Sequence, residues 1–587
     1  MKTVARYYKK YIPFILLTVL ALFGQVWCEL SLPRYMADII DNGIVTGNME
    51  HIRNVGLIMI GIAVIAVACS IAGGFFAALT AAGAAQAIRK NLFNKVIRFS
   101  AAELNKFSIA SLITRSTNDV QIIQQTTLSM MRLLMTAPIM GAGAVIMALK
   151  TSASLSWTLG LALICVSGLM IFSFIVIFPR FKMMQGKLDR INLVMKERLS
   201  GTLVVRAFRT EKHEEKRFDF ANRDLTQLYI FVNKALAFMM PTLMLIMSGA
   251  GVLIVWVGAH MVDAGELLIG NMLAYLQYAM LVIMSFMFVT MIFVMFPRAA
   301  VSARRIGTVL DAEISIADSE EPIAANEKKG VIEFRNVSFS YPGAVEKALA
   351  DISFTAEPGK MTAIVGGTGS GKTTLINLIP RFYDVSEGEI LFDGVDIRKM
   401  AQNELRRNIG MIPQKGTLFS GTIRSNLLYG NEDASDAELI EATEIAQATE
   451  FIREKPNGFD EEIAQGGANV SGGQKQRLCI ARAFVRRPGI YLFDDSFSAL
   501  DFATEKALRK SLRTSVGEST FIVVAQRINT IIDADRIIVL DDGRIVGDGK
   551  HEELMESCDV YHEIALSQLS DEELAAISEA AHREEEQ

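Results

Sequence analysis

The stretch Gly366-Gly367-Thr368-Gly369-Ser370-Gly371-Lys372-Thr373-Thr374 decides the fold of the second half of this chain. It fits the pattern GxxxxGK[ST] of a phosphate-binding loop, in which glycines let backbone N–H groups turn toward phosphates. The apolar run Met361–Val365 precedes it and a helical pattern follows, which is the strand–loop–helix context that the motif requires. We expect Lys372 to reach the β- and γ-phosphates of ATP and the Thr373 hydroxyl to bind Mg²⁺.

Two further runs, one before this loop and one well after it in the sequence, have the patterns of strands. Ile490–Asp494 is apolar until it ends in a carboxylate, as in the buried strand that presents a Mg²⁺-binding aspartate, here Asp494. Val331–Tyr341 alternates apolar and polar residues, and we predict an exposed edge strand there. Together these segments predict an α/β domain that binds ATP and Mg²⁺.

The first 300 residues carry most of the apolar side chains of a chain that is 51% hydrophobic. A membrane-spanning helix needs roughly 20 apolar residues. One such run could be a buried core helix, but a succession of six predicts six membrane spans. The runs are Tyr11–Cys28, Val55–Ala82, Leu133–Leu149, Leu155–Phe178, Ala235–Ala259 and Leu267–Phe296.

Lysine and arginine are distributed unequally between the links that join these spans. Lys2, Arg6, Lys9 and Lys10 precede the first span, and basic residues crowd the links after spans two and four. By contrast, the link after span three holds Lys150 alone and the link after span five holds neither residue type. Since basic residues stay on the cytoplasmic side, we expect both termini in the cytoplasm. The two long internal links have helical patterns and should project below the membrane.

Composition excludes several other classes of protein. The net charge of −5 argues against a nucleic-acid partner, which favours a strongly basic face. The five cysteines contain no CxxC pair, so we expect neither a zinc site nor a disulfide framework. The first apolar run is long and has no small-residue cleavage site, so we do not interpret it as a signal peptide. The expected location is the plasma (inner) membrane of a bacterium, with multiple passes and membrane lipids as neighbours.

One further motif narrows the class. Val470-Ser471-Gly472-Gly473-Gln474 resembles the ABC signature LSGGQ, with Val in place of Leu. Residues 331–560 thus resemble an ABC ATPase domain, and the whole chain resembles the half-transporters of multidrug-type ABC exporters. The resemblance implies an all-α domain of six membrane helices with long intracellular helices, followed by an α/β P-loop ABC ATPase domain. We expect the membrane domain at 1–310, a linker at 311–330, the ATPase domain at 331–570 and an acidic tail at 571–587.

The resemblance also assigns roles to individual positions. It implies that Tyr341 stacks on adenine, that Gln414 contacts Mg²⁺ and senses the γ-phosphate, and that Ser498–Asp501 form the D-loop. Two coupling helices are expected near Glu103–Ser111 and Leu199–Phe208. The expected Mg²⁺ contacts are Thr373, Gln414 and Asp494. The expected nucleotide contacts are Tyr341, Gly366, Gly367, Thr368, Gly369, Ser370, Gly371, Lys372, Thr373, Thr374, Gln414, Ser471, Gly472, Gly473 and Gln474.

Two positions depart from the family pattern. Asp495 stands where the family has the glutamate that positions the attacking water, and Gln526 stands where it has the switch histidine. We interpret the expected catalytic set, Asp494, Asp495 and Gln526, as one that binds ATP but hydrolyses it poorly. The alternative is that Asp495 acts as a weak base in a homodimeric exporter.

A degenerate site implies a different partner. In this family each ATP lies between one chain's phosphate loop and the other chain's signature, so the intact Ser471–Gln474 could complete a competent site on a second half-transporter. We expect a heterodimer that hydrolyses ATP and exports amphiphilic or hydrophobic drugs, lipids or peptides by alternating access, with an imperfect signature in the partner. Methionines in spans five and six suit such cargo, but they also suit helix packing. An ATP-regulated channel or regulatory half-transporter remains an alternative.

Overall fold

The computed structural model describes residues 2–324, 330–515 and 517–568. The chain divides into two compact units. One contains the residues up to Ile97 together with Ile109–Ala312, and the other contains Arg98–Ser108 and the chain from Glu313 onward. The boundaries proposed from the sequence remain proposals, and the acidic tail at 571–587 lies outside the described residues.

The first unit is entirely helical. In its described part, six helical segments are long and apolar enough to cross a membrane, as the sequence predicted. Each overlaps one predicted span, but the fourth and sixth helices begin at Ser156 and Ile269, one and two residues later than predicted. The side chain of Phe178 and those of residues 289–294 are outside the description. The elements are α1 (Lys2–Ala5), η1 (Arg6–Tyr11), α2 (Ile12–Asp38), η2 (Ile39–Ile44), α3 (Met49–Ile97), α5 (Ile109–Thr114), η3 (Arg115–Asp119), α6 (Val120–Thr151), α7 (Ser156–Ser200), α8 (Thr202–Ala207), α9 (Glu211–Asp263) and α10 (Ile269–Leu310).

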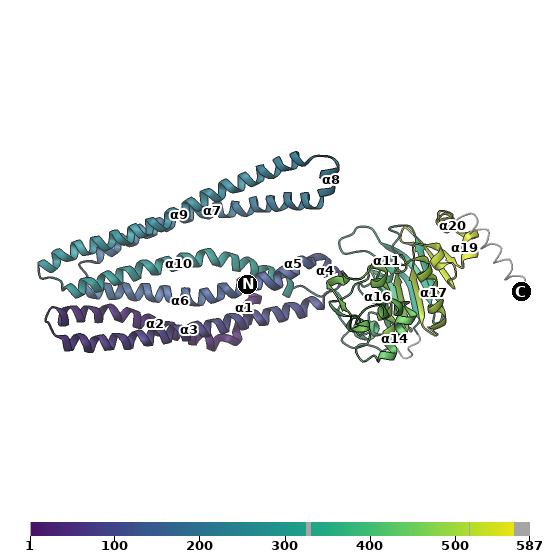
Figure 1. Ribbon diagram of the computed structural model, residues 1–587, viewed down its shortest axis with the longest axis horizontal. Coiled ribbons are helices and arrows are strands. Elements are labelled where there is room, and N and C mark those ends of the chain that lie inside the picture. The colour runs from purple at the N-terminus through teal and green to yellow at the C-terminus, as the bar shows by residue number, and fades with distance from the viewer. Residues whose placement is uncertain (1, 325–329, 516, 569–587) are drawn as a thin grey trace, which may run out of the picture. The chain divides into compact units, whose positions relative to one another are not determined.

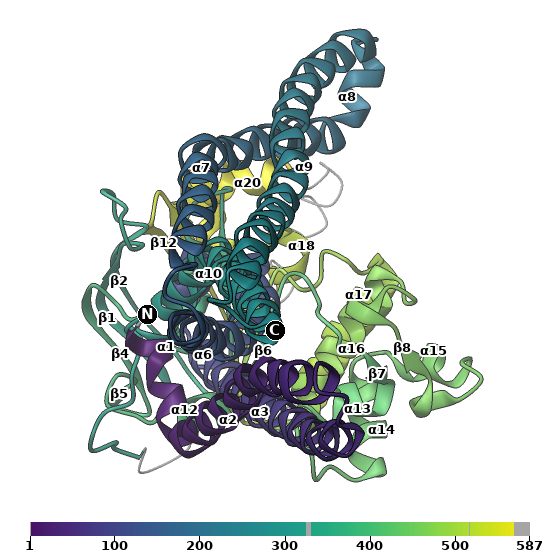
Figure 2. The same ribbon diagram turned by 90° about the vertical axis from the view of Figure 1, so that its left-hand side faces the viewer.

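The long helices of this unit pack mainly in pairs. Helix α10 lies along α6, and two fully buried tyrosines fix it: Tyr275 donates to the Leu155 carbonyl at 2.9 Å and Tyr278 to the Leu30 carbonyl at 3.0 Å. Helices α7 and α9 instead pair with each other and diverge from α6 and α10 toward α8 (Figures 1 and 2). Short helices lie at both predicted coupling positions, α8 in this unit and α4 (Ala101–Phe107) in the other.

The described residues of the second unit form three sheets. A six-stranded sheet has the order β12-β11-β3-β10-β9-β6, a four-stranded sheet has the order β2-β1-β4-β5, and β7 pairs with β8. The strands are β1 (Ile332–Phe339), β2 (Leu349–Ala356), β3 (Met361–Gly366), β4 (Glu387–Phe392), β5 (Val395–Asp396), β6 (Ile409–Ile412), β7 (Gly421–Thr422), β8 (Glu462–Ile463), β9 (Ile490–Asp494), β10 (Thr520–Val524), β11 (Arg536–Asp541) and β12 (Arg544–Gly549).

Helices flank these strands and connect them. They are α11 (Lys372–Leu378), α12 (Gln402–Arg407), α13 (Ile423–Leu427), α14 (Asp436–Ile445), α15 (Thr449–Arg453), η4 (Gly458–Asp460), η5 (Gln465–Gly467), α16 (Gly472–Val485), α17 (Phe502–Ser515), α18 (Ile528–Ile531), α19 (His551–Ser557) and α20 (Asp559–Leu566).

The prediction of an exposed edge strand at Val331–Tyr341 was wrong. Strand β1 pairs with β2 on one side and β4 on the other, so it lies inside its sheet. Its alternating pattern has another cause. In an antiparallel sheet with one covered face, alternate side chains point to the core and to solvent even in a central strand.

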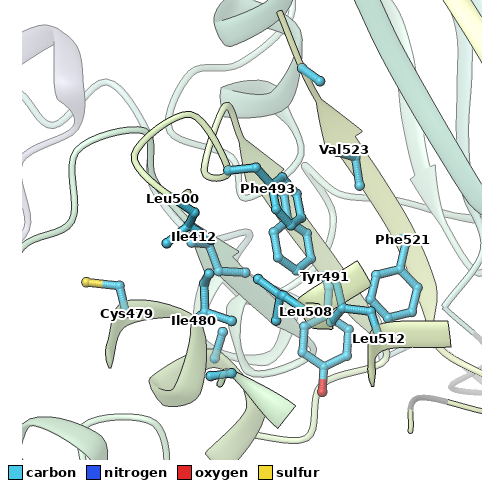
Figure 3. Packing of buried hydrophobic residues seen from close by; sticks show 14 of the residues in the cluster. Ile412, Cys479, Ile480, Tyr491, Phe493, Leu500, Leu508, Leu512, Phe521 and Val523 are labelled. Atoms are coloured by element: carbon cyan, nitrogen blue, oxygen red, sulfur yellow. The ribbon is translucent and has the colours of Figure 1, made fainter. Parts of the chain in front are cut away.

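The parallel strands of the large sheet are buried on both faces, which explains their continuous apolar sequence. In β9, Tyr491 and Phe493 belong to one hydrophobic cluster, while Ile490 and Leu492 belong to another. Figure 3 shows the first cluster, where Tyr491 stacks on Phe521 with ring centroids 5.2 Å apart. These two cores hold the carboxyl ends of β3, β9 and β10 in place, and the candidate site is built on those ends.

Candidate functional site

The phosphate loop links β3 to α11 with the backbone that its glycines permit. Gly369 and Gly371 adopt φ values of +89° and +100°, which L side chains rarely adopt. A Cβ on Gly371 would also stand 2.9 Å from the Ala348 carbonyl oxygen. The glycine pattern is therefore required by the observed turn.

Lys372 is folded back onto this loop. Its Nζ donates to the Gly366 carbonyl at 2.8 Å and to the Gly367 carbonyl at 2.7 Å. Burial lowers the pKa of the Lys372 ammonium, while the nearby Asp495 and Asp494 carboxylates oppose that shift. The acceptors of these two hydrogen bonds are neutral carbonyl oxygens. A bound phosphate would offer the ammonium negatively charged acceptors instead, and such charge-assisted hydrogen bonds are stronger.

Thr373 and Asp494 form a pair of oxygen donors next to the loop. The Thr373 hydroxyl donates to Asp494 Oδ1 at 3.1 Å, and Asp494 is 5% exposed. Burial raises the pKa of Asp494, and the hydrogen bond from Thr373 works in the opposite direction. Mg²⁺ typically binds one or two carboxylates, a hydroxyl and phosphate oxygens, so this donor set fits the ion that the family implies. Asp494 and Thr373 would hold it against the nucleotide phosphates.

Asp495 and Gln414 contact each other directly. Gln414 Nε2 donates to Asp495 Oδ2 at 3.0 Å, and Asp495 is 8% exposed. Asp495 also has a φ of +47°, which is uncommon for a residue with a side chain. The two residues predicted to face the γ-phosphate are thus brought together, with part of the hydrogen-bonding capacity of Asp495 already used.

Tyr341 lies beside the phosphate-loop helix. Its hydroxyl is 2.8 Å from Thr374 Oγ1, and its ring meets those of Phe339 and Tyr383 edge-on or nearly so. The side chain is 37% exposed, which leaves ring surface accessible to a base. This position fits the predicted contact with adenine.

The signature residues form a separate group at the start of α16. Ser471 caps this helix: its hydroxyl accepts from Gln474 N at 3.2 Å, and Gln474 Oε1 accepts from Ser471 N at 3.1 Å. The Ser471 carbonyl also accepts from Lys475 N at 2.9 Å, as the first turn of the helix continues. The same helix contacts the Q-loop, because Gln476 donates to the Pro413 carbonyl at 3.1 Å.

Sequence reasoning missed three residues that support the site. Gln476 and Ser496 each donate to a backbone carbonyl of the Ile412–Gln414 segment, and both are buried. Gln568 bonds to the backbone on either side of Arg527, next to Gln526. No motif could have revealed these contacts, since each joins positions far apart in the sequence.

Comparison with known proteins agrees with this architecture. The family profile described as the ABC transporter transmembrane region matches residues 14–286, and that described as ABC transporter matches residues 349–498. An uncharacterized ABC transporter ATP-binding protein of Mycobacterium tuberculosis is 40% identical over 546 residues, 92% of this chain and 93% of the relative. An ATP-dependent lipid A-core flippase of Desulfotalea psychrophila is 35% identical, covering 80% of this chain and 81% of the flippase.

A solved structure shares the fold. The bacterial Atm1-family ABC exporter with ATP bound matches with a TM-score of 0.75 and 24% identity, covering 96% of this chain and 99% of the exporter. The fold and site define a multi-pass membrane protein with a P-loop ATPase domain on the same chain. It belongs to the ABC transporter family, as a half-transporter of the exporter type with one transmembrane domain and one ATP-binding domain. Exporters of this family are ATP-driven and work as dimers.

Proposed function

We propose that this chain is the degenerate-site subunit of a heterodimeric exporter. Its own site holds ATP and Mg²⁺ and hydrolyses slowly, while its signature completes a competent site on a different half-transporter. The observation that carries the proposal is Asp495, in the position of the family's catalytic glutamate and hydrogen-bonded to Gln414.

The chemistry of Asp495 supports slow hydrolysis. Its carboxylate is one methylene shorter than that of glutamate, and a misplacement of about 1 Å can cost roughly a hundredfold in rate. The carboxylate also accepts the Gln414 amide at 3.0 Å, so positioning a water would compete with that bond.

Gln526 supports the same conclusion independently. An amide can donate a hydrogen bond to the γ-phosphate, but it cannot become cationic as histidine can. Charge-assisted hydrogen bonds are roughly twice as strong as neutral ones, so transition-state charge would be stabilised less. Lys372, Thr373 and Asp494 keep the chemistry of nucleotide binding, so the expected loss falls on hydrolysis.

The surface of α8 supports a dimer. Leu203 of α8 is 81% exposed and Phe208, the residue after α8, is 76% exposed. Val204 of α8 and Leu199 at the end of α7 are also exposed. Clustered apolar side chains on a cytosolic helix are typical of a protein interface. The proposed partner at this surface is the ATPase domain of the second half-transporter. In this proposal both termini lie in the cytoplasm, as the basic links predict.

For the cargo, we propose an amphiphilic or hydrophobic compound. Met240 and Met244 on α9 are exposed, which suits adaptable apolar contacts. Met284, Phe286 and Phe288 on α10 instead pack against a buried cluster, so part of the methionine pattern serves helix packing. The similarity to a lipid A-core flippase favours a lipid-like substrate.

ATP turnover of the purified full-length chain tests the proposal. Alone, the chain should release phosphate slowly, and coexpression with its partner half-transporter should restore turnover. Robust activity of the chain alone, abolished by Asp495→Asn, would favour the homodimer that uses Asp495 as a weak base. Vesicles that contain the pair test the channel alternative, because a transporter accumulates substrate against its gradient and a channel does not.

A further inference from the structure

The loop that contains Gln526, which we call the switch loop, and the residue directly after it are hydrogen-bonded to a single side chain of the C-terminal region. This loop, Ala525–Arg527, joins β10 to α18. Gln568, two residues past the end of α20, donates from Nε2 to the Gln526 carbonyl at 2.8 Å. Its Oε1 accepts from Ile528 N at 2.9 Å. One amide thus fixes the backbone on both sides of Arg527.

Helix α17 supports the same loop from another direction. Glu505 is 3% exposed and accepts from the Thr530 hydroxyl at 2.6 Å, while Arg509 donates to the Asn529 carbonyl at 2.6 Å. These contacts hold the residues after the loop, at the start of α18. The bond to the Gln526 carbonyl comes from Gln568.

The base from which Gln568 reaches the loop is well anchored. Tyr561 of α20 is fully buried, and its hydroxyl lies 2.8 Å from His551 Nδ1 of α19. Ala565 on the next turn is also fully buried. Gln568 lies two residues beyond this helix, and its backbone N donates to the Ala565 carbonyl at 3.0 Å. A residue whose backbone is already tied to a buried turn loses less freedom when its side chain forms two hydrogen bonds, so the contact can set the loop conformation.

A neutral switch residue depends on this positioning more than histidine would. The attraction of a cation for phosphate falls gradually with distance, whereas a hydrogen bond from a neutral amide weakens steeply once its angle falls below about 120°. A rotation of the Gln526 backbone that misaligns its amide would therefore weaken the contact of this site with the γ-phosphate.

We propose that Gln568 is a positioning residue that orients Gln526 toward the γ-phosphate of bound ATP. The inference rests on the proposed function only in that the site binds ATP, and it does not depend on the rate of hydrolysis. In this proposal the segment directly after α20 contributes to the selectivity of the site for ATP over ADP.

Equilibrium binding to the purified full-length chain tests this proposal. The probes are the non-hydrolysable imido analogue of ATP and ADP, each with Mg²⁺. Gln568→Ala should weaken binding of the ATP analogue roughly threefold to tenfold, the effect of about one net hydrogen bond, and leave ADP binding unchanged. The matched control is Ser567→Ala, because Ser567 is exposed and donates to the Ile564 carbonyl within its own turn. It should leave both ligands unchanged.

The variant Gln526→Ala separates positioning from a general structural effect. If Gln568 acts through Gln526, Gln568→Ala should cause no further loss of the ATP analogue in the Gln526→Ala background. Equal weakening of both ligands, additive losses in the double variant, or no loss at all would overturn the proposal. Because the probe cannot be hydrolysed, these outcomes are independent of whether the site proves to be catalytically slow.

Discussion

At the scale of single residues, two differences from the family pattern set the rate of hydrolysis in the proposed function. Asp495 is one methylene group shorter than glutamate, and Gln526 lacks the charge that histidine can carry. The double variant Asp495→Glu/Gln526→His restores both residues of the family pattern. It should raise ATP turnover at this chain's site by about a hundredfold. Phosphate release by the purified protein measures the effect. Asp495→Asn with Gln526→His is the control, since it restores the switch residue without a base. Equal turnover in both double variants would contradict the assigned role of position 495.

The raised pKa of Asp494 gives a pH dependence at the same scale. Metal binding requires the carboxylate, so Mg²⁺-dependent nucleotide affinity should decline as pH falls through the pKa of Asp494. Burial raises that pKa, so the decline should begin at a higher pH than for an exposed aspartate. The Thr373 hydrogen bond lowers it, so Thr373→Val should move the decline to still higher pH, while Thr373→Ser should not.

Nucleotide titrations at fixed Mg²⁺ from about pH 4, near the ordinary pKa of aspartate, up to neutral pH would measure both profiles. An identical midpoint in the wild-type chain and in Thr373→Val would show that the hydroxyl does not tune Asp494. The absolute affinity of the valine variant is expected to fall as well, because a Mg²⁺ donor is lost, so the comparison uses midpoints.

The members of the candidate site differ in how far the sequence could predict them. Lys372, Thr373 and Asp494 follow from motifs, because their spacing and their strand context are local. The Gln414–Asp495 bond was not predictable, since it depends on how two loops approach each other. Gln568 carries no signal at all, because a glutamine after a helix is ordinary and its contact lies 42 residues away.

At the scale of elements, α4 is fixed by one acidic residue. Ser100 caps the helix, and Glu103, which is 8% exposed, accepts from Ser100 N at 2.7 Å and Ser315 N at 3.4 Å. Burial acts to raise the pKa of Glu103, but the hydrogen bonds from Ser100 and Ser315 outweigh it and leave the pKa lowered. The stabilisation is therefore present above the unfolded-state pKa of the group and is lost as pH falls through the lowered value.

Glu103→Ala should destabilise the unit that contains α4 by about 1–2 kcal/mol, because it removes half of a capping box and the link to Ser315. Denaturant unfolding of the full-length protein measures the change at pH 7. Lys106→Ala on the same helix is exposed and should change stability by less than about 0.5 kcal/mol. Equal effects of the two substitutions would contradict the role given to Glu103.

The positions of helices and strands along the sequence were more predictable than which helices and strands pack against each other. Apolar runs located the six membrane helices and the buried strands, since length and periodicity are local properties. The position of β1 inside its sheet was missed because a half-buried central strand and an edge strand can share one alternating pattern. The divergence of α7 and α9 from α6 and α10 toward α8 was also not foreseen, because an apolar helix face does not specify which neighbour covers it.

At the scale of the whole molecule, the exposed apolar side chains of α8 and of Phe208 directly after it predict dependence on a second chain. Phe208→Ser should reduce coupled ATP turnover of the assembled transporter severalfold, because interface energy concentrates in buried aromatic anchors. Nucleotide binding by this chain should not change. Lys212→Ser, an exposed substitution at the start of α9, is the matched control. Unchanged copurification and turnover in Phe208→Ser would argue against an interface at this surface.

The central claim is that this chain's site holds ATP and hydrolyses it only slowly, and photolabelling tests that claim chain by chain. The full-length transporter is incubated with Mg²⁺ and 8-azido-ATP labelled on either the α- or the γ-phosphate, washed, irradiated and separated into its chains. We predict that this chain retains both labels equally, and that Lys372→Ala removes both. Retention of the α-label with loss of the γ-label would show that the site turns over, and would contradict the account.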